Sequence, residues 1–200
     1  MSESSLTVQQ YADAVTRSEL LKPEQLAELV RELKAQPTAK CAPFAEALTE
    51  RNLLTKWQNS HLTSGRFLGF FLGKYKLLEM LGAGGMGSVY LAEHILMRRK
   101  VAVKVLYPAR VDQTTLERFY LECQAVAALN HPNIITAHHF DNFEEFLYLV
   151  MEFVDGPDLQ SLIMEHGALP YLEAADYIAQ AAAGLAHAHE AGMVHRDIKP

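Results

Sequence analysis

The fold of this chain is decided by Leu81-Gly82-Ala83-Gly84-Gly85-Met86-Gly87-Ser88-Val89, which contains the pattern G-x-G-x-x-G-x-V. Dinucleotide-binding folds use the same glycine spacing, but there the glycines lead directly into a helix. Here residues 88–93 have the composition of a strand instead. The stretch is therefore predicted to be a hairpin that folds over phosphate groups. An ordinary glycine-rich hairpin without a ligand is the alternative interpretation.

The residues around this hairpin predict a mixed fold. Alternating apolar residues predict strands at 75–81, 88–93, 100–106, 134–140 and 147–153. One helix is expected between the third and fourth strands, at 115–130, with Thr114 and Glu117 spaced as a capping box. Two further helices are expected at 158–166 and 171–190. Strands and helices in this order predict an α+β fold.

Residues 1–64 are predicted to form a small all-α domain. Leu26, Leu29 and Leu33 form an apolar stripe with the period of a helix. A weak internal repeat aligns Asp13-Ala14-Val15-Thr16 with Glu46-Ala47-Leu48-Thr49. The segment is thus either two stacked helix-turn-helix repeats or a Leu-rich helical domain in which the agreement is accidental. Residues 65–74 are expected to link it to a second domain at 75–200.

Charge and cysteine content exclude several classes of protein. The formal net charge of −6 does not favour a nucleic-acid partner, which would require clustered Lys and Arg. Cys41 and Cys123 form no CxxC pair, so neither a disulfide framework nor a metal site is predicted. The longest apolar run, at 67–73, is well below the roughly 20 residues of a membrane-spanning helix. A cytoplasmic location is expected, with any membrane anchor beyond residue 200.

Lys104 and Glu122 are the first candidate pair of functional residues. Lys104 shares one face of its predicted strand with the small Ala102, and a charge on an apolar face needs a partner. Glu122 lies at helical spacing from Phe119 and Val126, on the apolar face of the predicted helix. Lys104 is either a lysine that reaches water at a strand end or one that holds the phosphates of a nucleotide, with Ala102 leaving room for the adenine ring.

The second candidate cluster is Val194-His195-Arg196-Asp197-Ile198-Lys199-Pro200, at the end of the sequence. It follows a long predicted helix and the turn residue Gly192. A carboxylate such as Asp197 could accept the proton of an attacking hydroxyl group. Lys199 could then neutralise charge on a transferring phosphoryl group.

Taken together and in this order, the motifs resemble those of the protein kinase family. They are the glycine loop, the V-A-V-K strand, Glu122, His131-Pro132-Asn133-Ile134, Met151-Glu152-Phe153-Val154 and H-R-D-I-K-P. Gly85-Met86 and Lys199 resemble the bacterial serine/threonine branch and not the tyrosine kinases. The resemblance implies a small lobe at 75–154, with a five-stranded antiparallel sheet and one helix, and the start of a large lobe at 155–200.

The resemblance also implies a nucleotide site. Lys104 would hold the α and β phosphates, and Glu122 would orient Lys104. Met151 would be the gatekeeper of the adenine pocket beside Ala102. The nucleotide would be covered by Leu81, Gly82, Ala83, Gly84, Gly85, Met86, Gly87, Ser88 and Val89, and its base would be bound by the backbone of Glu152 and Val154.

For catalysis, the resemblance implies that Asp197 is the base, that Lys199 assists it, and that Arg196 pairs with a phosphorylated activation loop. ATP and magnesium would be the cofactors, and serine or threonine on a protein the substrate. The family's magnesium ligands would lie beyond Pro200, so the chain by itself is expected not to transfer phosphate. The alternative function is a non-catalytic nucleotide-binding or protein-binding module that regulates or scaffolds.

Overall fold

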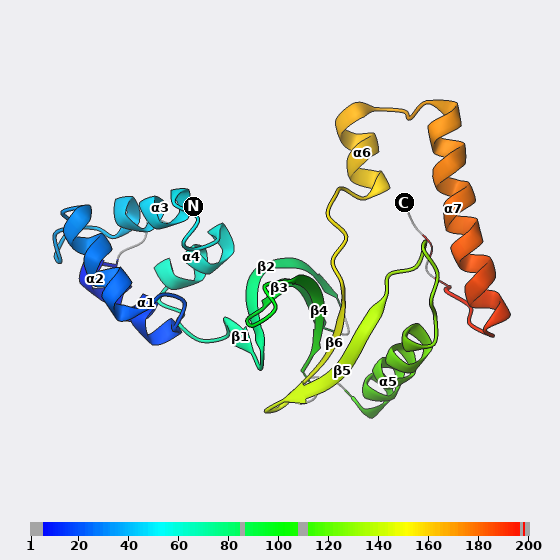
Figure 1. The fold of residues 1–200 in the computed structure, drawn as a ribbon, viewed down its shortest axis with the longest axis horizontal. Helices are drawn as coiled ribbons and strands as arrows, with labels where there is room; N and C mark the ends of the chain where they lie inside the picture. The colour runs from blue at the N-terminus through cyan, green and yellow to red at the C-terminus, as the bar shows by residue number, and fades with distance from the viewer. Residues whose placement is uncertain (1–5, 85–86, 108–111, 197, 199–200) are drawn as a thin grey trace. The chain divides into compact units, whose positions relative to one another are not determined.

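The structure is a computed structural model that describes residues 6–84, 87–107, 112–196 and 198. Figure 1 shows the order of its helices and strands. The chain divides into two compact units, Met1–Ala83 with Ser88–Lys100 and Gly84–Gly87 with Val101–Pro200. Each unit is described by itself.

The first unit begins with four helices, α1 (Val8–Ser18), α2 (Pro23–Glu32), α3 (Ala42–Glu50) and α4 (Lys56–Thr63). Thr7 and Gln10 form a capping box at the start of α1, and Thr55 and Gln58 form a second one at the start of α4. Pro23 is at the first position of α2, where its missing N–H costs no helical hydrogen bond. The predicted helical character of this segment is therefore present.

A partly buried polar network joins three of these helices. The hydroxyl of Tyr11 donates to Asn59 Oδ1 at 2.6 Å, and Asn59 Nδ2 donates to the carbonyl of Ala45 at 3.0 Å and to Thr49 Oγ1 at 2.9 Å. Burial, with a smaller effect from Cys41, raises the pKa of Tyr11. The neutral hydroxyl thus holds α1 to α4 while the amide holds α4 to α3. The fully buried side chains around this network include Val15, Leu48 and Leu62.

Three strands follow: β1 (Phe71–Leu72), β2 (Tyr75–Gly84) and β3 (Gly87–His94). All of their residues except Gly84 and Gly87 belong to the first unit. β1 was not predicted, so the sheet has six strands and not five. A strand of two residues is too short to show an alternating pattern in the sequence. The hairpin from β1 to β2 turns at Gly73, whose φ of 54° lies in the left-handed region that favours glycine.

The segment expected to be a linker, 65–74, contains β1 and two buried side chains. Phe70 belongs to the same hydrophobic core as the four helices, and Leu72 is also buried. Three glycines of this segment have a positive φ: Gly65, Gly69 and Gly73. The domain boundaries given from the sequence remain a prediction.

The second unit contains β4 (Lys100–Leu106), α5 (Gln113–Ala127), β5 (Ala137–Phe143) and β6 (Phe146–Glu152). β4 pairs antiparallel with β6, and β6 pairs antiparallel with β5. The complete sheet has the order β1-β2-β3-β4-β6-β5. An antiparallel sheet with a helix inserted between its strands confirms the predicted α+β fold.

Two predictions about this unit were wrong in detail. α5 is capped by Asp112, whose carboxylate accepts from the N–H of Thr115 at 2.7 Å, and not by a box of Thr114 and Glu117. Aspartate is the stronger N-cap residue, so the helix begins earlier. β5 begins at Ala137 and not at residue 134, because the N–H of Ile134 closes a turn onto the carbonyl of His131.

The chain continues with α6 (Leu159–His166) and α7 (Tyr171–Glu190). The loop at 131–134 contacts α7: Asn133 Nδ2 donates to the carbonyl of Gln180 at 2.9 Å, and His131 stacks on His187 with ring centroids 5.3 Å apart. α7 thus contacts the loop that precedes β5. Within the ranges that the structure describes, none of the helices has the length and hydropathy to cross a bilayer.

Candidate active site

Lys104 and Glu122 form the centre of the candidate site. β4 carries Lys104 between the buried residues Val103 and Val105, and its Nζ donates to Glu122 Oε1 at 2.5 Å. The two side chains are 20% and 40% exposed. The structure therefore brings together the lysine and the glutamate that the sequence pattern paired, and leaves both accessible to a ligand.

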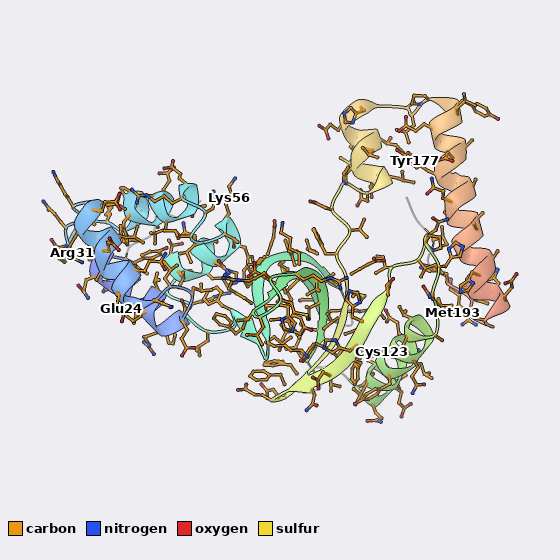
Figure 2. The ribbon with its side chains drawn as sticks, in the orientation of Figure 1. Glu24, Arg31, Lys56, Cys123, Tyr177 and Met193 are labelled. Atoms are coloured by element: carbon orange, nitrogen blue, oxygen red, sulfur yellow. The ribbon has the colours of Figure 1, made fainter. Side chains whose placement is uncertain are left out.

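An apolar cluster supports this ion pair. Leu106, Phe119, Cys123 and Leu149 are buried together, and Phe119 and Cys123 are on α5, where Figure 2 labels Cys123. Burial, reinforced by the charge of Glu122, raises the pKa of the Cys123 thiol to about 11. This thiol is protonated at neutral pH, so it fills space beside the ion pair and does not act as a nucleophile.

The glycines of the hairpin differ in what surrounds them. A Cβ on Gly87, whose φ is 148°, would lie 2.0 Å from the carbonyl oxygen of Val105. Gly87 is thus required by the close approach of the β4 backbone. At Gly82 and Gly84, by contrast, no heavy atom of the described chain would lie within 4 Å of an added Cβ. Packing within the described chain gives no reason for glycine at these two positions.

The other residues of the hairpin lie on β2 and β3. Leu81, Ala83 and Gly84 are exposed at the end of β2, whereas Ser88 and Val89 are half-buried on β3. Gly85 and Met86 lie outside the described residues. The end of β2 is therefore open to solvent up to Gly84, and the start of β3 is partly covered.

The residues expected around an adenine ring are neighbours in the sheet. Ala102 on β4 is directly opposite Met151 on β6, and Met151 packs against the apolar cluster that supports Lys104. Val154, after the end of β6, is 62% exposed. The structure thus places the small residue, the predicted gatekeeper and the segment that follows it at one end of the β4 and β6 pair.

Glu152 is held by Thr136 in a way that the sequence did not predict. The N–H of Glu152 donates to the carbonyl of Thr136 at 2.9 Å, and the N–H of Thr136 donates to Glu152 Oε1 at 2.7 Å. Neither contact has a local sequence signal, because the two residues are far apart in the chain. The backbone N–H of Glu152 is therefore already used within the protein.

The predicted catalytic residues Asp197 and Lys199 lie outside the described residues. Arg196, directly before Asp197, has a φ of 62°, which is uncommon for a residue other than glycine. Within the described ranges, no group of three or more His, Cys, Asp or Glu side chains is placed to hold a metal ion. The part of the site seen in the structure is the part that would bind a nucleotide.

Comparison with known proteins agrees with this geometry. The protein kinase domain model matches residues 75–200. The serine/threonine-protein kinase PrkC of Bacillus subtilis (strain 168) is 40% identical over 129 residues, which are 64% of this chain and 20% of PrkC. The serine/threonine-protein kinase PknB of Mycobacterium leprae (strain TN) is 40% identical over 135 residues, 64% of this chain and 21% of PknB.

A similar fold is present in a solved bacterial kinase. The crystal structure of the Mycobacterium tuberculosis PknI kinase domain has a TM-score of 0.55 and 35% sequence identity, covering 66% of this chain and 56% of that chain. The chain spans about a fifth of the length of the curated relatives PrkC and PknB. Because the family match covers more than half of its residues, this chain belongs to the protein kinase family and is similar to its bacterial serine/threonine members.

Proposed function

We propose that this chain is part of a cytoplasmic kinase that transfers phosphate from ATP to serine or threonine residues of proteins. The observation that carries the proposal is the ion pair between Lys104 and Glu122, at 2.5 Å. A strand lysine fixed by a helix glutamate is the arrangement that protein kinases require for phosphate binding. The family match and the bacterial relatives support the same reaction.

The residues present fit ATP. Lys104 has three N–H donors, of which one is used by Glu122, so two remain for phosphate oxygens. Gly82 and Gly84, which no internal contact explains, would let the hairpin backbone approach the phosphates. Ala102, opposite Met151, is a small residue where the family's adenine pocket would need one. If Glu152 contacts that base through its backbone, its carbonyl is the available group, since its N–H is donated to Thr136.

The chemical step is proposed for the residues after α7. Asp197 accepts the proton of the serine or threonine hydroxyl as that oxygen bonds to the γ-phosphorus of ATP. The bond from this phosphorus to the β–γ bridging oxygen breaks, and ADP leaves. Lys199 stabilises the negative charge on the transferring group. Bound magnesium would supply positive charge against the phosphates, and the residues that would hold it are expected beyond Pro200.

A non-catalytic nucleotide-binding or scaffolding module is the rival function. It would retain the hairpin and the ion pair but transfer no phosphate. The complete protein distinguishes the two functions, because a scaffold would bind ATP without forming phosphoserine or phosphothreonine.

The ion pair gives the first prediction. In the complete protein, Lys104→Met and Glu122→Gln are each expected to reduce the rate of autophosphorylation by about a hundredfold or more, because Lys104 holds the phosphates and Glu122 orients Lys104. The double variant should lose little beyond either single variant, since the two residues act as one unit. Rates would be measured as ³²P incorporation from ATP.

Glu117→Gln is the matched control for these single and double variants. Glu117 is on the same helix, but it is exposed and accepts a hydrogen bond from Gln113, a contact that glutamine can keep. This variant is expected to retain the wild-type rate. Normal activity of Lys104→Met would show that this lysine does not hold the phosphates and would remove the main support for the proposed function.

A further inference from the structure

The capping box of α4 contacts β2 as well as its own helix. Thr55 Oγ1 accepts from the N–H of Gln58 at 3.1 Å, and Gln58 Oε1 accepts from the N–H of Thr55 at 3.0 Å. The remaining donors of both side chains reach two successive carbonyls of β2. The Thr55 hydroxyl donates to Leu78 at 2.5 Å, and Gln58 Nε2 donates to Leu77 at 2.7 Å.

The burial of Gln58 makes these contacts specific. Its side chain is 2% exposed, and a buried amide group without partners is costly. Among the described residues, every buried side-chain nitrogen and oxygen atom has a hydrogen-bond partner. The amide of Gln58 therefore has one satisfied arrangement, with its oxygen on the helix and its nitrogen on the strand.

Trp57 adds a contact with the second strand of the glycine hairpin. Its ring is 5.7 Å from that of Tyr90 on β3 and 5.8 Å from that of the buried Phe70. Lys56, labelled in Figure 2, begins the same turn of α4. This single turn thus contacts both β2 and β3, the strands that the glycine loop joins.

The capping box of α1 shows that capping alone does not require such contacts. Thr7 and Gln10 make the same reciprocal hydrogen bonds, with the N–H of Thr7 donating to Gln10 Oε1 at 2.9 Å. Gln10 is exposed. The two boxes share their chemistry and differ in whether a strand is attached.

We propose that Thr55 and Gln58 are positioning residues that fix β2 and thereby allow the N-terminal helices to set the nucleotide affinity of the glycine loop. β2 runs without interruption from Leu77 to Gly84. A shift of its backbone at Leu77 and Leu78 is therefore carried a few residues along the strand to Leu81, Gly82 and Ala83. The proposal rests on the proposed function, because it assumes that these residues cover a nucleotide.

Gln58→Glu separates docking from capping. Glutamate keeps the oxygen that caps α4, and it is the preferred residue at this position of a capping box. It cannot donate to the carbonyl of Leu77 and places a second acceptor there. Gln10→Glu makes the identical change in α1, where Gln10 is exposed and the backbone of Thr7 pairs with Lys40 in an isolated bridge, not with a strand of the sheet.

The test measures two quantities on the complete protein: hydrogen–deuterium exchange of residues 77–84 and the dissociation constant of a fluorescent ATP analogue, mant-ATP. Gln58→Glu is expected to speed exchange and to weaken mant-ATP binding by about fivefold or more each, the usual lower size of coupling between two sites. Gln10→Glu is expected to match the wild type in both. Circular dichroism confirms that the helices are retained.

A second pair of variants covers the case in which Gln58→Glu fails to fold. Thr55→Val removes the hydroxyl that donates to Leu78 and is compared with Thr7→Val in α1. Thr55→Ser keeps a hydroxyl at this position and should therefore bind mant-ATP as the wild type does. Equal mant-ATP affinities in the α4 and α1 variants would overturn the proposal. If the wild type bound no mant-ATP, the proposed function would fail and the positioning role with it, while the difference in exchange would still report the docking of α4.

Discussion

At the scale of single residues, Gly87 and Gly84 have different tasks although they belong to one motif. Gly87 is in contact with the β4 backbone at Val105, the residue after Lys104, whereas Gly84 has open space around it in the described chain. The motif therefore has a packing requirement at Gly87, whereas for Gly84 we propose a requirement set by the nucleotide. Sequence spacing alone does not separate these two causes.

This difference gives a prediction for stability. Gly87→Ala is expected to lower the free energy of unfolding by about 1–3 kcal/mol, because an added Cβ meets a carbonyl oxygen and the φ of 148° is strained for alanine. Gly84→Ala should change it by less than about 1 kcal/mol and should weaken mant-ATP binding instead. Urea unfolding of both variants checks this, and equal stabilities would contradict the packing role of Gly87.

At the scale of elements, α7 is fixed to the loop at 131–134 by a small residue. A Cβ on Gly184 would lie 2.9 Å from the carbonyl oxygen of Asn133 and 3.3 Å from Cγ1 of Ile134. Glycine within a helix ordinarily costs about 1 kcal/mol relative to alanine. Here the close approach of the loop outweighs that cost.

Gly184→Ala is therefore expected to destabilise the protein although alanine is the better helix former. The melting temperature should fall by at least a few degrees, since a backbone carbonyl has to move. Ala181→Gly, an exposed position on the same helix, is the reference for propensity alone and should cost about 1 kcal/mol. A melting temperature for Gly184→Ala above that of the wild type would show that the loop is not held against α7.

The elements were predictable to different degrees for physical reasons. α7 begins and ends at the predicted residues because its long helical period has no competing signal. The predicted start of α5 was wrong because Asp112 and Thr114 can both cap a helix. Only the structure shows that Asp112 accepts the hydrogen bond from the first turn. β1 was missed because Phe71 and Leu72 are too few to show a period.

At the scale of the whole molecule, the order of the motifs was sufficient to predict the kinase family, because each motif is local in sequence. The pairing of Lys104 with Glu122 was also predictable, since strand alternation and helical spacing fix both directions. The contacts of Thr55 and Gln58 with β2 were not predictable from the sequence. A capping box has the same sequence pattern whether or not a strand lies beside it. The sequence therefore identifies the parts of the site better than the long-range contacts that hold them.

The central claim is that the protein containing this chain transfers phosphate from ATP to serine or threonine with Asp197 as the base. The most direct measurement is phosphoamino-acid analysis after incubation of the complete protein with [γ-³²P]ATP and magnesium, for the wild type, Asp197→Asn and the exposed-site control Glu190→Gln. We predict phosphoserine or phosphothreonine in the wild type and the control, and a loss of at least about a hundredfold in Asp197→Asn. Absence of phosphate transfer in the wild type, or transfer that is unchanged in Asp197→Asn, would contradict the claim.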